Sequence, residues 1–400
     1  MTVTYEDVLA ARRTIEGHVR RTDIAPLTLP DQSIIYLKTE CLQYTGSFKV
    51  RGAYNKMLSL SEEERRHGVI AASAGNHAQG VALAAKTMGI QAIIVMPRFA
   101  PLQKITATER LGAKVILHGD VFDDAYAYAL EQARERHMVL IHAFDDPYVI
   151  AGQGTMALEI LEDVPDVSTI FLPIGGGGMA AGIGVAVKSI RPDIRLVGVE
   201  PRGAASMKSS FDAKHLMKLP NAATIADGVA VKSPGTLNYE LCKSYLDDIL
   251  TVEEDEIART ILYLMERGKL VVEGAGAVPI AALLFGHYDT HKHKTVAIAS
   301  GGNIDVTMLA RIIDRGLLKA GRKVTLQTNI SDRPGELSDV LQSVSQTGAN
   351  IVNIHHERSR AHLELKEVRL EFTLETRDRA HISAIIHDLN TKGYHVKALK

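Results

Sequence analysis

The stretch YTGSFKVRGA, residues 44–53, places Lys49 in a half-apolar run, with Gly46 shortly before it and Arg51 just after it. A lysine amine attacks a carbonyl group only when part of it is unprotonated, and both burial and a nearby positive charge lower its pKa. The stretch therefore indicates either a reactive lysine or a surface lysine at the start of a helix that begins near Ser47. On its own it favours neither interpretation.

The composition is that of a globular protein of two or three domains. The chain has 400 residues, of which 46% are hydrophobic, and a formal net charge of -1, so nothing steers it towards nucleic acid or an acidic membrane surface. Its two cysteines, Cys41 and Cys242, form no disulfide framework and fit a reducing compartment. We find no apolar signal segment in residues 1–15 and no run long enough to span a bilayer, so we expect a cytoplasmic protein.

Short apolar strands alternate with helices over most of the chain. The expected strands lie at residues 69–73, 91–96, 113–117, 169–173, 194–199 and 295–299. Such alternation predicts two parallel α/β sheets, with a small subdomain at about residues 51–150 inserted in a larger one. Ligands bind at the carboxyl ends of strands in such sheets, so we expect a site in the cleft between the two.

Residues 323–400 have a different pattern. The expected order is strand, helix, strand, strand, helix, strand, and the strands alternate, as in VRLEF at 368–372, which leaves one face exposed to water. This order predicts a ferredoxin-like βαββαβ fold. The segments DRPGEL at 332–337 and GANI at 348–351 resemble those of ACT domains. We expect a catalytic domain at 1–320 and an ACT domain at 323–400.

Four consecutive glycines, Gly175–Gly178, follow an expected strand and precede a helix that begins near Met179. The backbone N–H groups of such a turn can close on an anion at the positive end of the helix. The spacing Gly175-x-Gly177-x-x-Ala180, with Glu200 after the next strand, also fits a dinucleotide site and hence an NAD-dependent oxidoreductase. Close packing of helix on strand is a third interpretation, and the loop alone leaves all three open.

Two further segments, SAGNHAQG at 73–80 and SGGN at 300–303, also follow expected strands. The amides at the start of a helix suit a substrate carboxylate, although Asn76 is also a common type of helix cap. Ser300, in the same way, is typical of an ordinary turn.

The four motifs, in this order, resemble those of the threonine/serine dehydratases among the fold-type II (tryptophan synthase β-like) pyridoxal-phosphate enzymes, over about residues 5–318. The resemblance implies that Lys49 carries pyridoxal 5'-phosphate and is the catalytic residue. It implies that the cofactor is bound by Lys49, Phe48, Asn76, Gly175, Gly176, Gly177, Gly178, Met179 and Ser300. It implies that the substrate contacts Ser73, Ala74, Gly75, Asn76 and His77. Lys49 and Ser300 together favour the anion interpretation of the glycine loop.

The implied reaction is β-elimination, which converts L-threonine to 2-oxobutanoate and ammonia and L-serine to pyruvate and ammonia. By resemblance, Ser300 faces the ring nitrogen of the cofactor and leaves it largely unprotonated, a weaker electron sink that favours prompt loss of the β-hydroxyl. The ACT resemblance implies an amino-acid effector, isoleucine or valine, and a homo-tetramer or homo-dimer. Isoleucine biosynthesis and threonine catabolism both fit such an enzyme.

Serine racemases resemble this chain throughout and define an alternative activity. They carry a serine at the position of Ala74, and Ala74 has no proton to give, so we expect racemisation to be poor. They also bind a divalent ion through residues that match Glu200, the backbone at Ala204, and an aspartate where this chain has Ser206. Loss of one hard oxygen ligand weakens such a site, so we expect no divalent metal, and a monovalent ion is the alternative left open.

Overall fold

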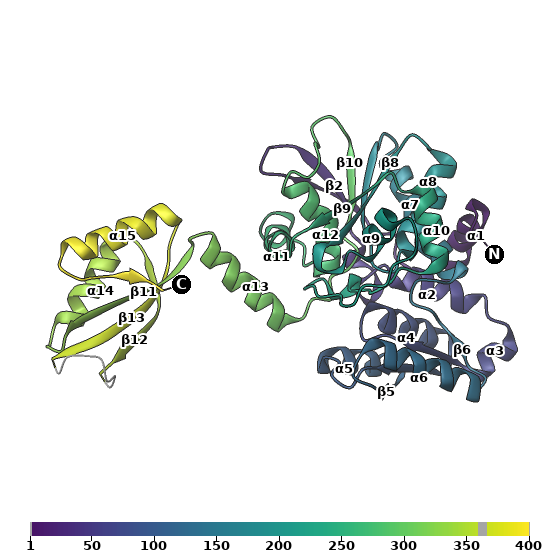
Figure 1. Ribbon diagram of the computed structural model, residues 1–400, viewed down its shortest axis with the longest axis horizontal. Helices are drawn as coiled ribbons and strands as arrows, with labels where there is room; N and C mark the ends of the chain where they lie inside the picture. The colour runs from purple at the N-terminus through teal and green to yellow at the C-terminus, as the bar shows by residue number, and fades with distance from the viewer. Residues whose placement is uncertain (1, 359–365, 400) are drawn as a thin grey trace. The chain divides into compact units, whose positions relative to one another are not determined.

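The computed structural model describes residues 2–358 and 366–399, and the chain divides into two compact units, residues 1–305 and 306–400 (Figure 1). The first unit holds two separate sheets and the second holds one. Among the described residues, no helix is both long enough and apolar enough to cross a membrane.

The larger sheet of the first unit has six strands in the order β1-β2-β10-β7-β8-β9. They are β1 (Ile24–Thr28), β2 (Ile34–Lys38), β7 (Thr169–Pro173), β8 (Arg195–Pro201), β9 (Asp248–Val252) and β10 (Thr295–Ile298). β1 pairs antiparallel with β2, and the other neighbouring strands are parallel. β7 and β10 are buried along their whole length, as expected for continuous apolar runs in a sheet covered on both faces.

The smaller sheet is fully parallel and has the order β5-β4-β3-β6. Its strands are β3 (Val69–Ala72), β4 (Ala92–Met96), β5 (Lys114–Leu117) and β6 (Val139–Leu140). All four lie between β2 and β7 in the chain, so the smaller sheet is inserted into the larger one. The prediction of two parallel α/β sheets is confirmed.

The helices of the first unit fill the layers around these sheets. They are α1 (Tyr5–Ile15), α2 (Lys49–Leu58), α3 (Glu62–His67), α4 (Asn76–Met88), α5 (Leu102–Arg110), α6 (Phe122–Glu135), α7 (Pro147–Asp163), α8 (Gly178–Ile190), α9 (Ser206–Ala213), α10 (Thr236–Tyr245), α11 (Glu254–Tyr263) and α12 (Gly274–Leu284). Helix α7 crosses α2 with the two backbones in contact: a Cβ on Gly152 would lie 2.7 Å from the Cα of Gly52. This close crossing sets the position of α2, which begins with Lys49.

The second unit begins with helix α13 (Val306–Lys319) and continues as an antiparallel sheet in the order β12-β13-β11-β14. Its elements are β11 (Lys323–Ser331), α14 (Glu336–Gln346), β12 (Asn350–Glu357), β13 (Glu367–Glu375), α15 (Arg379–Thr391) and β14 (Lys397–Ala398). Val368, Leu370, Phe372 and Leu374 alternate towards a core that includes Val344 of α14 and Ile385 of α15. The ferredoxin-like prediction is therefore confirmed.

Candidate active site

Helix α2 begins at Lys49 and follows a tight turn. Thr45 and Gly46 both have positive φ values, 61° and 69°, and a Cβ on Gly46 would lie 2.5 Å from Oδ1 of Asn303. Glycine suits this position because it adopts the left-handed conformation and leaves room for the asparagine. The amide of Phe48 donates to the carbonyl of Ser300 at 3.1 Å, so the 300–303 motif lies directly beside the lysine.

One pocket, with an empty volume of about 510 Å³ that includes its open mouth, brings together residues from all four motifs. Its lining includes Phe48, Lys49, Asn76, Gly175, Gly176, Gly177, Gly178, Met179 and Ser300. Of the predicted substrate contacts, only Asn76 lines this pocket. Ser73, Ala74 and Gly75 form the turn that precedes Asn76, and His77 follows it on α4.

The glycine loop between β7 and α8 is both closely packed and rich in free donors. A Cβ on Gly176 would lie 2.2 Å from the ring of Phe144, and Gly177 has a φ of 92°. The carbonyl groups of Gly176 and Gly177 accept hydrogen bonds from residues in or next to α10. Among the described residues, the amides of Gly175–Gly177 donate to no other backbone group. The packing and anion interpretations are therefore compatible, and the loop can bind a phosphate.

The amine of Lys49 lies at the wall of this pocket. Its Nζ donates to the carbonyl of Ala143 at 2.9 Å and lies 5.3 Å from the centre of the Phe48 ring. Burial lowers the pKa of Lys49 to about 8, and the charge of Glu273 opposes this change. The amine is therefore much more often neutral near physiological pH than an exposed lysine.

We expect the coenzyme-free protein to react with an aldehyde at Lys49 with a pH midpoint near 8, because only the neutral amine is nucleophilic. Reaction should be slow below this pH and reach a plateau above it. In the Glu273→Gln variant the charge that raises the lysine pKa is gone, so the midpoint should move to lower pH. Stopped-flow absorbance with pyridoxal measures both midpoints. A midpoint near the ordinary lysine value of about 10.4 would contradict the burial argument.

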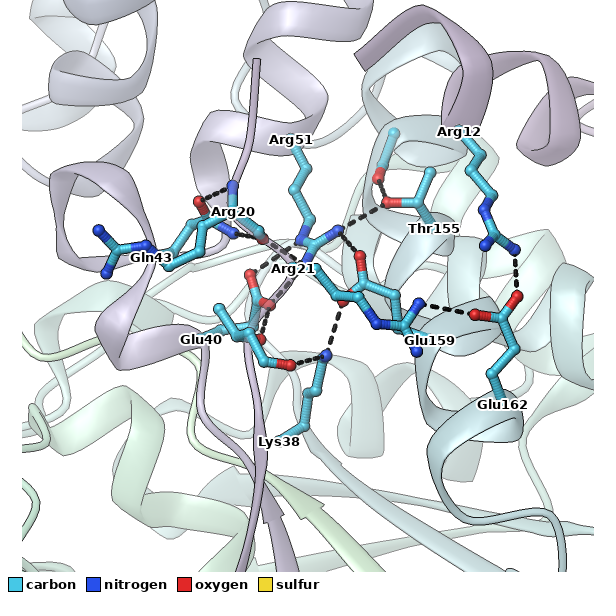
Figure 2. Close-up of polar contacts among 12 residues, drawn as sticks. Arg12, Arg20, Arg21, Lys38, Glu40, Gln43, Arg51, Thr155, Glu159 and Glu162 are labelled. Carbon is cyan, nitrogen blue, oxygen red and sulfur yellow. Dashed lines mark hydrogen bonds and ion pairs between the residues drawn. The ribbon is translucent and has the colours of Figure 1, made fainter. Parts of the chain in front are cut away.

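Arg51 does not perturb Lys49, contrary to the expectation that its charge would help lower the lysine pKa. Lys49 and Arg51 are two residues apart, which is a rotation of about 200° around the helix axis. Their side chains therefore lie on nearly opposite sides of α2. Figure 2 shows the Arg51 guanidinium among carboxylates instead. It contacts Glu40 at 2.7 Å and Glu159 at 2.7 Å, and its own side chain is fully buried. Burial of the amine is therefore what lowers the lysine pKa.

The contacts of Arg51 belong to a buried cluster of four charges, which we call the Arg51 cluster: Lys38, Glu40, Arg51 and Glu159. Lys38 contacts Glu159 at 2.6 Å. Burial alone would raise the pKa of Glu40, but the Arg51 charge holds it below its usual value. The cluster ties α2 to β2, to the turn after it and to α7, and its charges sum to zero.

The sequence interpretation missed Glu273, a buried carboxylate that lines the pocket. Its Oε1 accepts a hydrogen bond from Nδ2 of Asn76 at 2.6 Å, and Oδ1 of Asn76 accepts one from Asn303 at 2.8 Å. Burial raises the pKa of Glu273 to about 7. A glutamate between the apolar run LVV and the small residues GAGA, at the start of α12, was the available signal.

The ring of His77 does not line the pocket, and its Nε2 donates to the carbonyl of Ile141 at 2.8 Å. Burial, together with the charge of Lys49, lowers the pKa of His77 to about 3, so the ring is neutral. Ser73 is also engaged locally, since its hydroxyl accepts a hydrogen bond from the amide of Gly75 at 3.2 Å. Any contact of His77 with a substrate would therefore come mainly from its backbone, whereas the Ser73 hydroxyl still has its O–H to donate.

Glu200 is fully buried and cannot hold a ribose. Its carboxylate accepts hydrogen bonds from the amides of Met207 and Lys208, at 2.9 and 2.7 Å, at the start of α9. Burial raises the pKa of Glu200 to about 8. The dinucleotide interpretation required the Glu200 carboxylate to be exposed near the glycine loop, where it could bind a ribose. Its burial excludes this role.

Comparison with known families identifies the class to which this fold and pocket belong. The family of pyridoxal-phosphate dependent enzymes matches residues 15–301, and the ACT domain family matches residues 319–392. The chain is therefore a member of the pyridoxal-phosphate dependent enzyme family, with an ACT domain after the catalytic part.

Individual relatives are more specific. The chain is 49% identical to the L-threonine ammonia-lyase of Thermotoga maritima and 45% identical to that of Geobacter sulfurreducens, with 99% of each chain covered in both comparisons. Among solved structures, maize serine racemase matches with a TM-score of 0.74 and 35% identity over 80% of this chain and 99% of that one. Threonine deaminase isoform 2 from Solanum lycopersicum matches with a TM-score of 0.72 and 40% identity over 78% of this chain and 92% of that one.

The residues present fit pyridoxal phosphate. The donors of the glycine loop, which have no backbone partner among the described residues, suit its phosphate. The amine of Lys49, with its lowered pKa, suits its aldehyde, and Ser300 lines the same pocket.

Proposed function

We propose that this protein removes the β-hydroxyl of L-threonine to give 2-oxobutanoate and ammonia, and acts on L-serine to give pyruvate and ammonia. The observation that supports this most is a single pocket holding both the lysine amine and the glycine loop. The near full-length similarity to two L-threonine ammonia-lyases supports the choice of substrate.

Bound pyridoxal phosphate supplies the electron sink that stabilises negative charge at the α-carbon of the substrate. The loop Gly175–Gly178 holds the phosphate, and the amides at the start of α4 hold the substrate carboxylate. Lys49 accepts the α-proton, a task that suits an amine with a pKa of about 8. Glu273 holds Asn76 in place through their 2.6 Å hydrogen bond. After the β-hydroxyl leaves, water converts the released enamine to the 2-oxo acid and ammonia.

The proposal is tested by incubating the holoenzyme with L-threonine and measuring 2-oxobutanoate and ammonia in equal amounts. Reduction of the holoenzyme with borohydride followed by peptide mapping should place the coenzyme on Lys49. A protein that releases no ammonia from either amino acid, or an adduct on another lysine, would overturn the assignment.

Serine racemase activity is the second candidate, because a serine racemase structure matches so much of the chain. Racemisation needs a proton donor on the face opposite the lysine, and Ala74 offers none. Chiral chromatography of the serine reaction should therefore show pyruvate with little D-serine. Rapid formation of D-serine would favour the second candidate.

The ACT domain supports control by an amino-acid effector, which we propose to be isoleucine or valine. The pocket that holds Lys49 is lined by residues between Phe48 and Ser300, all of which precede the ACT domain. Deleting residues 323–400 should therefore leave threonine turnover and abolish any response to isoleucine or valine. Steady-state kinetics with and without the two amino acids measures this. A response that survives the deletion would place the effector site elsewhere.

We further propose a homo-tetramer or homo-dimer in the cytoplasm, with a catalytic domain at 1–320 and a regulatory domain at 323–400. Along the chain, the boundary between the two compact units falls between residues 305 and 306, so helix α13 belongs to the second unit. Light scattering of the purified protein tests the assembly.

A further inference from the structure

Asn238 lies on α10, fully buried behind the glycine loop. Its Nδ2 donates to the carbonyl of Gly176 at 2.8 Å and to the carbonyl of Phe144 at 3.0 Å. Both partners accept only, so the nitrogen of the amide must face them. Its Oδ1 is buried without a hydrogen-bond partner among the described residues. An unpaired buried oxygen is costly, and the two bonds from Nδ2 offset that cost.

The segment 142–145 connects Asn238 to the reactive lysine. Asp145 accepts hydrogen bonds from the amides of Thr236 and Asn238, at 3.0 and 3.2 Å, and so fixes the first turn of α10. Two residues earlier, the carbonyl of Ala143 accepts the hydrogen bond from Lys49. One short segment therefore holds both the amine and the helix that holds the glycine loop.

The Gly176 carbonyl accepts hydrogen bonds from Asn238 and, at 3.1 Å, from the amide of Gly235, and its direction determines where the next amide points. In a trans peptide the C=O of one residue and the N–H of the next point in opposite directions. When Asn238 holds the Gly176 carbonyl towards α10, the amide of Gly177 is turned away from α10, to the pocket that the loop lines. Glycines on both sides would let this peptide flip at little cost, and a flipped peptide would present an oxygen to an anion.

We propose that Asn238 is a positioning residue for the phosphate loop, which prevents the Gly176–Gly177 peptide from flipping. This inference rests on the proposed function, because it assumes that the anion is the phosphate of pyridoxal phosphate. The role differs from a purely structural one in a measurable way: it acts on the phosphate and leaves the aldehyde end of the coenzyme untouched.

The test compares two aldehydes, pyridoxal phosphate and pyridoxal, which lacks the phosphate. Titration of the coenzyme-free protein, followed by absorbance, gives a dissociation constant for each. Asn238→Leu removes the hydrogen-bond donors of the side chain at similar volume. It should weaken the binding of pyridoxal phosphate about 10- to 100-fold and change the binding of pyridoxal little. Asn55→Leu is the matched control, since Asn55 is also buried and donates from Nδ2 to one carbonyl, that of Tyr148, at 2.7 Å. It should leave the ratio of the two constants unchanged.

An unchanged ratio in Asn238→Leu would overturn the inference while leaving the proposed function standing. If the leucine variant does not fold, Asn238→Ser gives the same comparison, because its short side chain cannot reach both carbonyl groups. A wild-type protein that binds neither aldehyde would instead overturn the proposed function, and this inference with it.

Discussion

Lys49→Ala is expected to lower kcat/KM for L-threonine by about 10⁴-fold or more, because it removes both the attachment point of the coenzyme and the base that accepts the α-proton. No other lysine lines the pocket among the described residues. Borohydride should leave no adduct in this variant, and free coenzyme should be lost on dialysis.

Lys56→Ala is the control for this variant. Lys56 lies on the same helix, but its amine pairs with Asp146 at 2.8 Å, outside the pocket. Its removal should leave turnover near that of the wild type. Activity of the Lys49 variant within tenfold of the wild type would mean that another group performs the proton transfer.

Arg51→Met is expected to destabilise the first unit by about 3–5 kcal/mol, because it leaves the carboxylates of Glu40 and Glu159 buried without their main partner. Denaturant unfolding followed by a signal from the first unit measures the loss. Activity should fall as well, since α2 carries Lys49 and loses its contacts to β2 and α7.

Arg12→Met is the matched control for the arginine. Arg12 pairs with Glu162, as Figure 2 shows, but both side chains are more than 40% exposed. Exposed ion pairs contribute below about 1 kcal/mol, so this variant should unfold at nearly the wild-type denaturant concentration. Equal losses in the two variants would contradict the argument that burial makes the Arg51 cluster costly to break.

The sequence allowed the fold and the meeting of the motifs to be predicted, because the motifs at 73–80, 175–178 and 300–303 each follow a short apolar strand. Parallel strands place their carboxyl ends at one edge, so Ser300 and the glycine loop had to lie close together at the edge of the larger sheet. Asn76 lies at the carboxyl edge of the smaller sheet, and its place beside them followed only from the expectation of a site between the two sheets. The edge strands β1 and β9 were not predicted. Their alternation is interrupted, by Pro26 in β1 and by a polar start at Asp248 in β9.

The supporting residues could not be predicted, because their roles come from contacts between distant parts of the chain. Asn76 and Glu273 are 197 residues apart, and Asn238 reaches Gly176 across 62 residues. Arg51 was misjudged for the same reason: its neighbours in sequence gave no sign of Glu159, 108 residues away. Local patterns indicate which residues react, and the long-range contacts that orient them emerge only in the fold.

The neutrality of the Arg51 cluster has a practical consequence for engineering. Buried ion pairs can often be exchanged as a whole for apolar side chains of similar volume without loss of stability, and sometimes with a gain. Lys49 faces the other side of α2, so such a redesign of Lys38, Glu40, Arg51 and Glu159 leaves the reactive amine unaltered. It offers a route to a more heat-resistant catalyst in which the wild-type chemistry is retained.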